Sequence, residues 1–208
     1  MATAHEHTPS AASRDHLYRV PDDELSARTK ALEQLLISRG LLSTDAVDQI
    51  TSAYENDISP LLGSRVVAHA WVNPDFKRDL LTDATATCRS VGIGGLQGEY
   101  LVAVENSDQV HNVVVCTLCS CYPWPVLGLP PRWYKAPAYR ARIVASPRQT
   151  LRDAFGLDLP ESITIKVWDS SSEIRYFVLP QRPIGTEHLS EDDLVPLVGR
   201  DRLIGVAR

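Results

Sequence analysis

The sequence predicts an α+β fold in which a helical N-terminal arm precedes a compact domain of antiparallel strands layered with helices. Two observations support this prediction. Apolar residues recur at helical spacing through the first ninety residues, and β-rich runs joined by short polar connections begin only after a glycine cluster. We therefore expect a flexible lead-in over residues 1–20, a helical arm over 21–92 and a compact domain over 93–208.

The arm is predicted from leucine spacing and from residues that cap helices. Four leucines share one face of the first helix: Leu25, Leu32, Leu35 and Leu36. Gly40 ends this helix, Ser43 or Thr44 caps a second one, and Asn73-Pro74 begins a third. Because these amphipathic helices precede every predicted strand, we expect the arm to contact a partner subunit.

The compact domain is predicted to contain two hairpins. LVAVEN and HNVVVC, residues 101–106 and 111–116, form the first, and ITIKVWD and EIRYFVL, residues 163–169 and 173–179, form the second. Between them, Ser146-Pro147 begins a helix. A capping box of Ser190 and Asp193 begins a short helix near the C-terminus.

Composition excludes several classes of function. The chain has 208 residues, with 21 Lys and Arg against 26 Asp and Glu, and it has no dense basic tract, so we expect no nucleic-acid partner. It also lacks an apolar run approaching the ~18 residues of a membrane span. Its first residues, MATAHEHTPSAASRDH, lack the apolar segment of a secretory signal, so we expect a cytoplasmic protein without membrane contact.

Three of the four cysteines lie within six residues, in the run Cys116-Thr117-Leu118-Cys119-Ser120-Cys121. In a reducing compartment, thiols clustered so unevenly indicate a metal or redox site rather than a disulfide framework. Cys88 lies alone on a predicted helix, and we expect it to be a small buried residue.

Two kinds of metal site are compatible with this spacing. A structural zinc site or an iron–sulfur cluster takes four ligands, so a fourth would come from Cys88, a histidine or water. Alternatively, deprotonated backbone amides of Ser120 and Cys121 join the three sulfurs, which gives five ligands and an open sixth position on a trivalent ion. Such a position can polarise a bound substrate or lower the pKa of bound water. The domain over 93–208 is therefore predicted to bind metal and to be catalytic.

The run VCTLCSCYPWPVLGLPP, residues 115–131, resembles the metal-binding loop of nitrile hydratase α subunits. The resemblance extends over roughly residues 22–206 and includes GIGGLQGE, VHNVVVC, WYKAPAYRAR and VWDSSSE. It implies hydration of a nitrile to its amide at a low-spin, trivalent, non-corrin cobalt centre. Thr117 follows the pattern of cobalt members, so Fe(III) is the less favoured ion.

The resemblance also implies roles for individual residues. The metal ligands are the sulfurs of Cys116, Cys119 and Cys121 and the backbone nitrogens of Ser120 and Cys121. Cys119 is expected as sulfinic acid, Cys121 as sulfenic acid and Cys116 as an unmodified thiolate. Cys121, Cys119, Ser120 and Gln97 are the expected catalytic residues, and the nucleophile, water or the Cys121 sulfenate, stays open.

The surroundings of the loop receive separate predictions. Trp124 is expected to line the substrate pocket. Arg140 and Arg142, in the run YRAR, are interpreted as solvated or interface charges.

Family members draw arginines from a separate β subunit to stabilise the oxidised cysteines. We therefore expect an αβ heterodimer or a higher assembly such as α2β2, and a metal-insertion activator is a further expected partner. The preferred nitrile stays open. Two alternatives remain: the metal-bearing subunit of a thiocyanate hydrolase, and a non-catalytic zinc-binding protein.

Overall fold

The computed structural model describes residues 22–56, 60–94, 100–119 and 121–208. Its helices are α2 (Asp22–Ser38), α3 (Thr44–Asn56), α4 (Pro60–Val72), α5 (Pro74–Thr82), α6 (Ala84–Ser90), α7 (Trp124–Leu127), α8 (Pro137–Ala145), α9 (Pro147–Phe155), α10 (Glu191–Leu194) and α11 (Arg200–Ile204). Its strands are β1 (Tyr100–Glu105), β2 (Val110–Val115), β3 (Thr164–Asp169) and β4 (Ile174–Leu179). Within these ranges, no helix combines the length and the apolar character needed to cross a membrane.

The mixture of helices and strands confirms the α+β class, but the predicted antiparallel pairing is wrong. β1 pairs in parallel with β4, and β2 pairs in parallel with β3, which gives two sheets of two strands each. All four predicted runs are strands. Each of them pairs with a strand from the other predicted hairpin.

Buried polar side chains explain why the neighbours in sequence do not pair. The side-chain oxygen of Asn106 accepts a hydrogen bond from the Asn112 backbone N–H at 2.7 Å, and the Asn112 amide donates to the Glu105 carbonyl at 2.7 Å. In the second predicted hairpin, the Ser170 hydroxyl accepts from the Tyr176 N–H at 3.2 Å. These side chains occupy backbone groups that a hairpin would pair directly.

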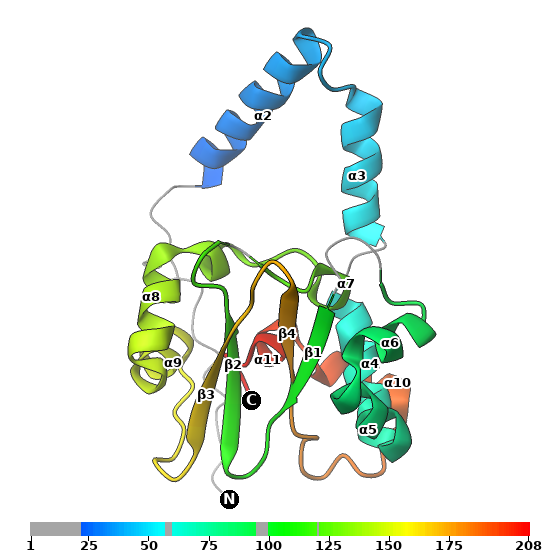
Figure 1. Ribbon diagram of the computed structural model, residues 1–208, viewed down its shortest axis with the longest axis vertical. Helices are drawn as coiled ribbons and strands as arrows, with labels where there is room; N and C mark the ends of the chain where they lie inside the picture. The colour runs from blue at the N-terminus through cyan, green and yellow to red at the C-terminus, as the bar shows by residue number, and fades with distance from the viewer. Residues whose placement is uncertain (1–21, 57–59, 95–99, 120) are drawn as a thin grey trace, which may run out of the picture.

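Helices cover the strands on both sides. In Figure 1, α4, α5 and α6 lie beside β1, whereas α8 and α9 lie beside β3. One hydrophobic cluster joins both sides with the strands, and its fully buried members include Val67, Leu80, Cys88, Val113, Phe177 and Leu203. The expectation that Cys88 is a small buried residue is confirmed, since it has no exposed surface.

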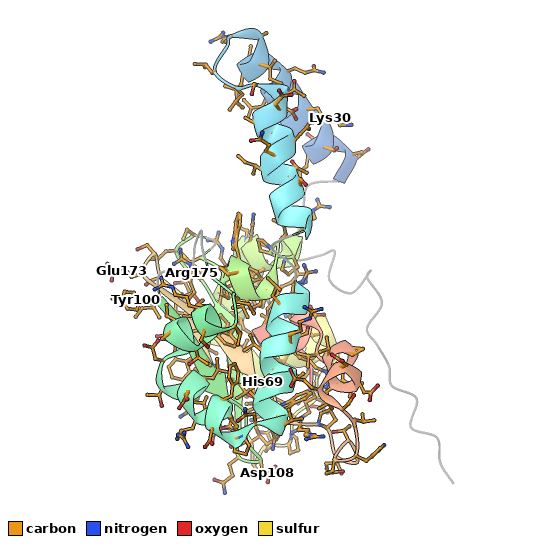
Figure 2. All side chains as sticks on the ribbon, turned by 90° about the vertical axis from the view of Figure 1, so that its right-hand side faces the viewer. Lys30, His69, Tyr100, Asp108, Glu173 and Arg175 are labelled. Atoms are coloured by element: carbon orange, nitrogen blue, oxygen red, sulfur yellow. The ribbon has the colours of Figure 1, made fainter. Side chains whose placement is uncertain are left out.

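The first two helices project away from this body (Figures 1 and 2). Leu32 on α2 is 57% exposed and Leu35 is 47% exposed. By contrast, α4, α5 and α6 contribute residues to the core. Among the described residues, the packing therefore changes after α3.

Local capping follows the sequence closely. The Asn73 side chain accepts from the backbone N–H groups of Asp75 and Phe76, and the Ser43 hydroxyl accepts from the N–H of Ala46, which makes Ser43 rather than Thr44 the cap. The helix that starts at Pro60 was not predicted. α9 and the capping box of α10 are confirmed.

The helix predicted from Asn73-Pro74 toward Gly92 is two helices, α5 and α6. They are separated by Asp83, whose backbone is non-helical at φ −145° and ψ 87° and whose side chain caps α6 by accepting from the Ala86 N–H at 2.9 Å.

Candidate metal centre

The cysteine loop begins where β2 ends. β2 runs toward the end of the body from which α2 and α3 project, so the loop and the arm lie at the same end of the molecule (Figure 1). The Sγ atoms of Cys116 and Cys119 are 3.4 Å apart, and those of Cys119 and Cys121 are 3.0 Å apart. All three sulfur atoms lie within 4.8 Å of one another. The turn therefore brings the three predicted sulfur ligands together.

This arrangement fits a single metal ion. Thiolates are soft ligands that suit cobalt, iron or zinc. Two sulfurs bound at right angles, at about 2.3 Å from an ion, lie about 3.3 Å apart. The observed separations of 3.4 and 3.0 Å are close to that value.

The three thiols differ in exposure. Cys116 and Cys121 are buried, whereas Cys119 is exposed, and Leu118 beside it is 87% exposed. Burial raises the pKa of the Cys121 thiol to about 12, and contacts with Cys119 and Cys116 add to this shift. A metal ion that binds Cys121 as a thiolate therefore has to displace a firmly held proton.

Asp169, the last residue of β3, fixes the start of the loop. Its carboxylate accepts from the Thr117 backbone N–H at 2.9 Å and from the Thr117 hydroxyl at 2.5 Å. Val115 and Asp169 are partners in the β2–β3 register, so the strand pairing brings this carboxylate to the loop.

Arg140, on α8, holds the middle of the loop. Its Nη1 donates to the carbonyl oxygen of Cys119 at 2.9 Å and lies 3.5 Å from that of Thr117. Arg140, interpreted from the sequence as a solvated or interface charge, is partly exposed and in addition contacts the loop backbone. Arg142 instead pairs with Asp153 at 3.4 Å, away from the loop.

Buried tyrosines support the loop from within. The Tyr134 hydroxyl donates to the Cys121 carbonyl at 3.1 Å, and the Tyr139 hydroxyl donates to the Val114 carbonyl at 3.0 Å. The rings of Tyr122 and Tyr134 meet edge to face, with centroids 4.9 Å apart. This aromatic layer ties the end of β2 and the end of the loop to the core.

Arg175 of β4 places a buried positive charge near Cys121. It is 5% exposed and its guanidinium donates to the Ser171 carbonyl. Its charge acts to lower the pKa of the Cys121 thiol, but burial of the thiol outweighs that effect. Figure 2 shows Arg175 close to Glu173, on the same side of the body as Tyr100.

The sequence matches the family model for the nitrile hydratase α chain over residues 23–207. The chain belongs to the nitrile hydratase α-chain family. It is 59% identical over 186 residues to the low-molecular-weight cobalt-containing nitrile hydratase α subunit of Rhodococcus rhodochrous, and the match covers 89% of each chain. It is 58% identical over 183 residues to the cobalt-containing α subunit of Pseudonocardia thermophila, which covers 88% of this chain and 90% of that one.

Two further relatives match at lower sequence identity. The structure of an Fe-type nitrile hydratase mutant from Comamonas testosteroni Ni1 superposes with a TM-score of 0.83 at 42% identity, covering 91% of this chain and 92% of that chain. The γ subunit of thiocyanate hydrolase from Thiobacillus thioparus is 41% identical over 188 residues, covering 85% of this chain and 76% of its own.

The remaining predicted residues of the nitrile hydratase site are placed only in part. Ser120 and Gln97 lie outside the described residues. Trp124 is the first residue of α7, where it is partly buried and packs against the hydrophobic core. Its role as a wall of the substrate pocket stays a prediction.

Sequence reasoning missed Asp169, Arg140 and Arg175 as neighbours of the cysteine loop. Each lies on another element, between 21 and 54 positions from the cysteine-loop residue that it affects, so loop spacing alone does not point to it. Two sequence features could have pointed to these contacts: the aspartate that ends the strand run VWD, and the two arginines of the run YRAR.

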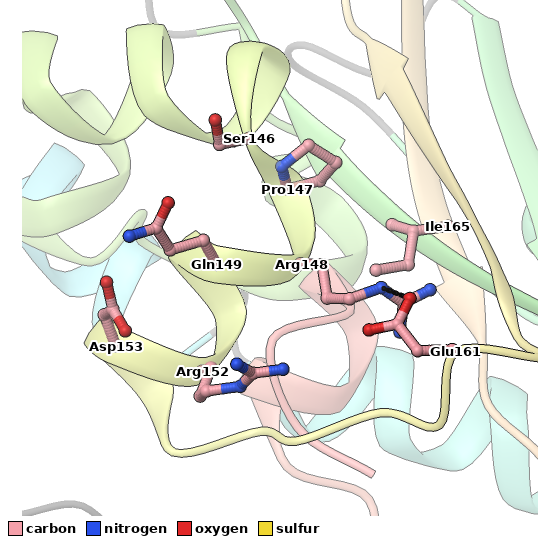
Figure 3. A pocket seen from close by; sticks show the side chains of 8 residues that line it. All are labelled: Ser146, Pro147, Arg148, Gln149, Arg152, Asp153, Glu161 and Ile165. Carbon is pink, nitrogen blue, oxygen red and sulfur yellow. Dashed lines mark ion pairs between the residues drawn. The ribbon is translucent and has the colours of Figure 1, made fainter.

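Two hollows lie near α8 and α9. One, of about 380 Å³, lies between the loop and α8 and is lined by Thr117, Arg140 and Val144 among others. The other, of about 610 Å³, lies at the start of α9 (Figure 3). In it, Arg148 donates to three backbone carbonyls and Arg152 pairs with Asp158, so its cations serve the local structure.

Proposed function

We propose that this chain is the metal-bearing α subunit of a nitrile hydratase, which hydrates a nitrile to its amide at a trivalent cobalt centre. The convergence of the Cys116, Cys119 and Cys121 sulfurs within 4.8 Å carries the proposal. The ion is assigned as cobalt because relatives at 58–59% identity are named as cobalt-containing subunits.

The loop supplies the ligands. Three sulfurs and the backbone nitrogens of Ser120 and Cys121 would hold the ion. When bound, the ion would supply Lewis acidity that makes the nitrile carbon open to attack by water or by the Cys121 sulfenate. Cys119 is proposed as sulfinic acid and Cys121 as sulfenic acid.

The chain's own residues pre-organise this site. Asp169 and Arg140 fix the backbone of the loop on its outer side, and Tyr134 fixes the Cys121 carbonyl from the core. Ligands held in this way change position little when substrate binds, which lowers the reorganisation cost of catalysis. Gln97 and Trp124 are proposed to contact the substrate.

A β subunit completes the active site in this proposal. Leu118 and Cys119 are exposed in the loop that follows β2, and β2 ends at the side of the body that carries α2 and α3 (Figure 1). A partner that covers the apolar residues of the arm also reaches the loop, where its arginines pair with the oxidised cysteines. We propose a cytoplasmic αβ heterodimer or larger assembly, and an activator that inserts the metal.

The proposal is tested on the native complex purified with its partner. We expect cobalt in elemental analysis, turnover of an aliphatic nitrile, and no turnover of thiocyanate. Intact mass of this chain is expected to exceed the sequence mass by two oxygens for the sulfinic acid and one for the sulfenic acid. Zinc without cobalt or iron would refute the proposal in favour of a zinc-binding protein, and thiocyanate as sole substrate would refute it in favour of a thiocyanate hydrolase.

A further inference from the structure

Arg140 fixes the backbone of the loop, but that role does not by itself require a positive charge. Its guanidinium reaches from α8 to the loop and donates to the Cys119 carbonyl oxygen at 2.9 Å. Arg140 is only partly exposed, and its Nε is buried without a hydrogen-bond partner among the described residues. A guanidinium keeps its positive charge at any pH at which the protein is folded, and partial burial strengthens the field of that charge.

The oxygen that Arg140 contacts belongs to a particular peptide group. The Cys119 carbonyl shares its peptide bond with the nitrogen of Ser120, which is one of the two backbone ligands in the proposed function. The resonance that makes a peptide planar also links its nitrogen to its oxygen. When such a nitrogen binds a metal as an anion, part of the negative charge therefore lies on the carbonyl oxygen.

We propose that Arg140 is a positioning residue for the metal centre, which compensates the negative charge of the Cys119–Ser120 peptide and fixes the orientation of that peptide. Because it requires a backbone ligand, this inference rests on the proposed function. Hydrogen bonds between a charged donor and a charged acceptor are roughly twice as strong as neutral ones. The ligand nitrogen thus gains a counter-charge from its own chain without direct contact between Arg140 and the metal.

The test separates charge from hydrogen bonding by comparing three variants within the purified complex. Arg140→Gln keeps a donor but removes the charge, and Arg140→Lys keeps the charge but loses the planar fork. Arg142→Gln is the matched control, because Arg142 is on the same helix and pairs with Asp153. The measurements are metal content per chain, the rate of metal loss to a chelator, and the energy of the sulfur-to-metal charge-transfer band.

We expect Arg140→Gln to lose metal roughly tenfold faster than the unmodified complex, because residues that support metal ligands typically contribute 10–100-fold to affinity. Its charge-transfer band should also shift, which a merely structural contact would not cause. Arg140→Lys should restore most of the retention, and Arg142→Gln should match the unmodified complex. Circular dichroism of each variant checks folding.

Two results would overturn the inference, and they differ from failure of the proposed function. Unchanged metal loss and an unchanged band in Arg140→Gln, in a complex that contains cobalt, exclude a role for the Arg140 charge. If Arg140→Gln does not fold, Arg140→Lys provides the test. The reference for fast metal loss is Thr117→Val, which removes the hydrogen bond from the Thr117 hydroxyl to Asp169. Metal loss from Arg140→Lys as fast as from Thr117→Val would contradict the inference. Zinc in the unmodified complex would instead refute the proposed function, and it is detected before any variant is compared.

Discussion

Thr117 and Asp169 form a two-point contact that ties the metal loop to the end of β3. The Asp169 carboxylate accepts from the Thr117 N–H at 2.9 Å through one oxygen and from the Thr117 hydroxyl at 2.5 Å through the other. Both residues are exposed, so the contact contributes little to stability, but two hydrogen bonds to one carboxylate fix the direction of the loop.

The hydroxyl of Thr117 is therefore expected to matter more than its methyl group for holding the loop. Thr117→Val keeps the shape and removes the hydrogen bond, which should lower the free energy of unfolding by about 1 kcal/mol and accelerate metal loss. Thr117→Ser keeps the hydroxyl and should preserve both properties. Urea unfolding and metal release to a chelator measure the two effects. Equal damage from both variants would show that the methyl group, rather than the contact with Asp169, holds the loop.

How far the sequence predicts this site depends on how local each contact is. The spacing of Cys116, Cys119 and Cys121 dictates their convergence, because ligands two and three residues apart close around one point. Asp169 is 52 residues from Thr117, and Arg140 is 21 residues from Cys119. Their positions follow from the pairing of β2 with β3 and from the packing of α8, which local spacing does not determine.

The same distinction applies to the fold. Runs of β-branched residues identified every strand, but the choice of partners depends on the buried side chains of Asn106 and Asn112. The helix over Pro60–Val72 was missed because it is apolar on most sides, and a buried helix lacks the periodic face that identifies an exposed one.

A close approach of two backbones at Gly205 should make that position intolerant of a side chain. Gly205 follows α11 with φ +86°, and an added Cβ would lie 2.0 Å from the Asn112 carbonyl oxygen. Gly185 has a similar φ of +83° with no atom within 4 Å, which makes Gly185→Ala the matched control. We expect Gly185→Ala to cost about 1 kcal/mol from backbone strain and Gly205→Ala at least about 2 kcal/mol more. Thermal unfolding measures both, and equal losses would contradict the contact with Asn112.

Burial of His111 should make the fold less stable in mild acid. Burial lowers the pKa of His111, the nearby charge of Arg208 acts in the same direction, and the hydrogen bond to the Gly205 carbonyl opposes them. Because the pKa is lower in the folded state, the unfolded chain binds the proton more readily. The contribution of neutral His111 to the free energy of unfolding is therefore complete above about pH 6.5. It is lost as the pH falls from there toward the lowered pKa of the folded state.

His111→Gln should weaken this pH dependence, since glutamine is neutral and its amide can still donate to the Gly205 carbonyl. The measurement is the free energy of urea unfolding at pH 7.5 and pH 5.5. We expect a smaller difference between the two pH values in the variant than in the unmodified chain. The same difference in both would exclude His111 as the titrating group.

Cys88 should have no part in metal binding. It is fully buried within α6, burial raises its pKa to about 12, and it is absent from the group of described residues that can hold an ion. Cys88→Ala should therefore leave the metal content and the charge-transfer spectrum unchanged while lowering the free energy of unfolding by about 1 kcal/mol. Loss of metal in this variant, with the fold intact, would make Cys88 the fourth ligand of a structural site.

The exposed leucines of α2 provide the sharpest test of the proposed partner. Leu32 and Leu35 are 57% and 47% exposed, outside the hydrophobic core, so replacing both with Asp should change the stability of the isolated chain by no more than about 0.5 kcal/mol per site. If a β subunit covers this face, the same double variant buries two charges in an apolar contact and should lose co-purification with the partner.

Ile184→Asp is the control for that experiment, because Ile184 is fully exposed and lies in the segment after β4, and β4 ends at the side of the body opposite the arm (Figure 1). It replaces a more accessible apolar side chain on a surface that the proposal leaves free, so the complex should form normally. Since the loop and the arm lie at the same end, the Leu32 and Leu35 variant should also lose activity in proportion to the partner lost. If the complex still assembles after both leucines are replaced with Asp, the partner binds elsewhere on the chain.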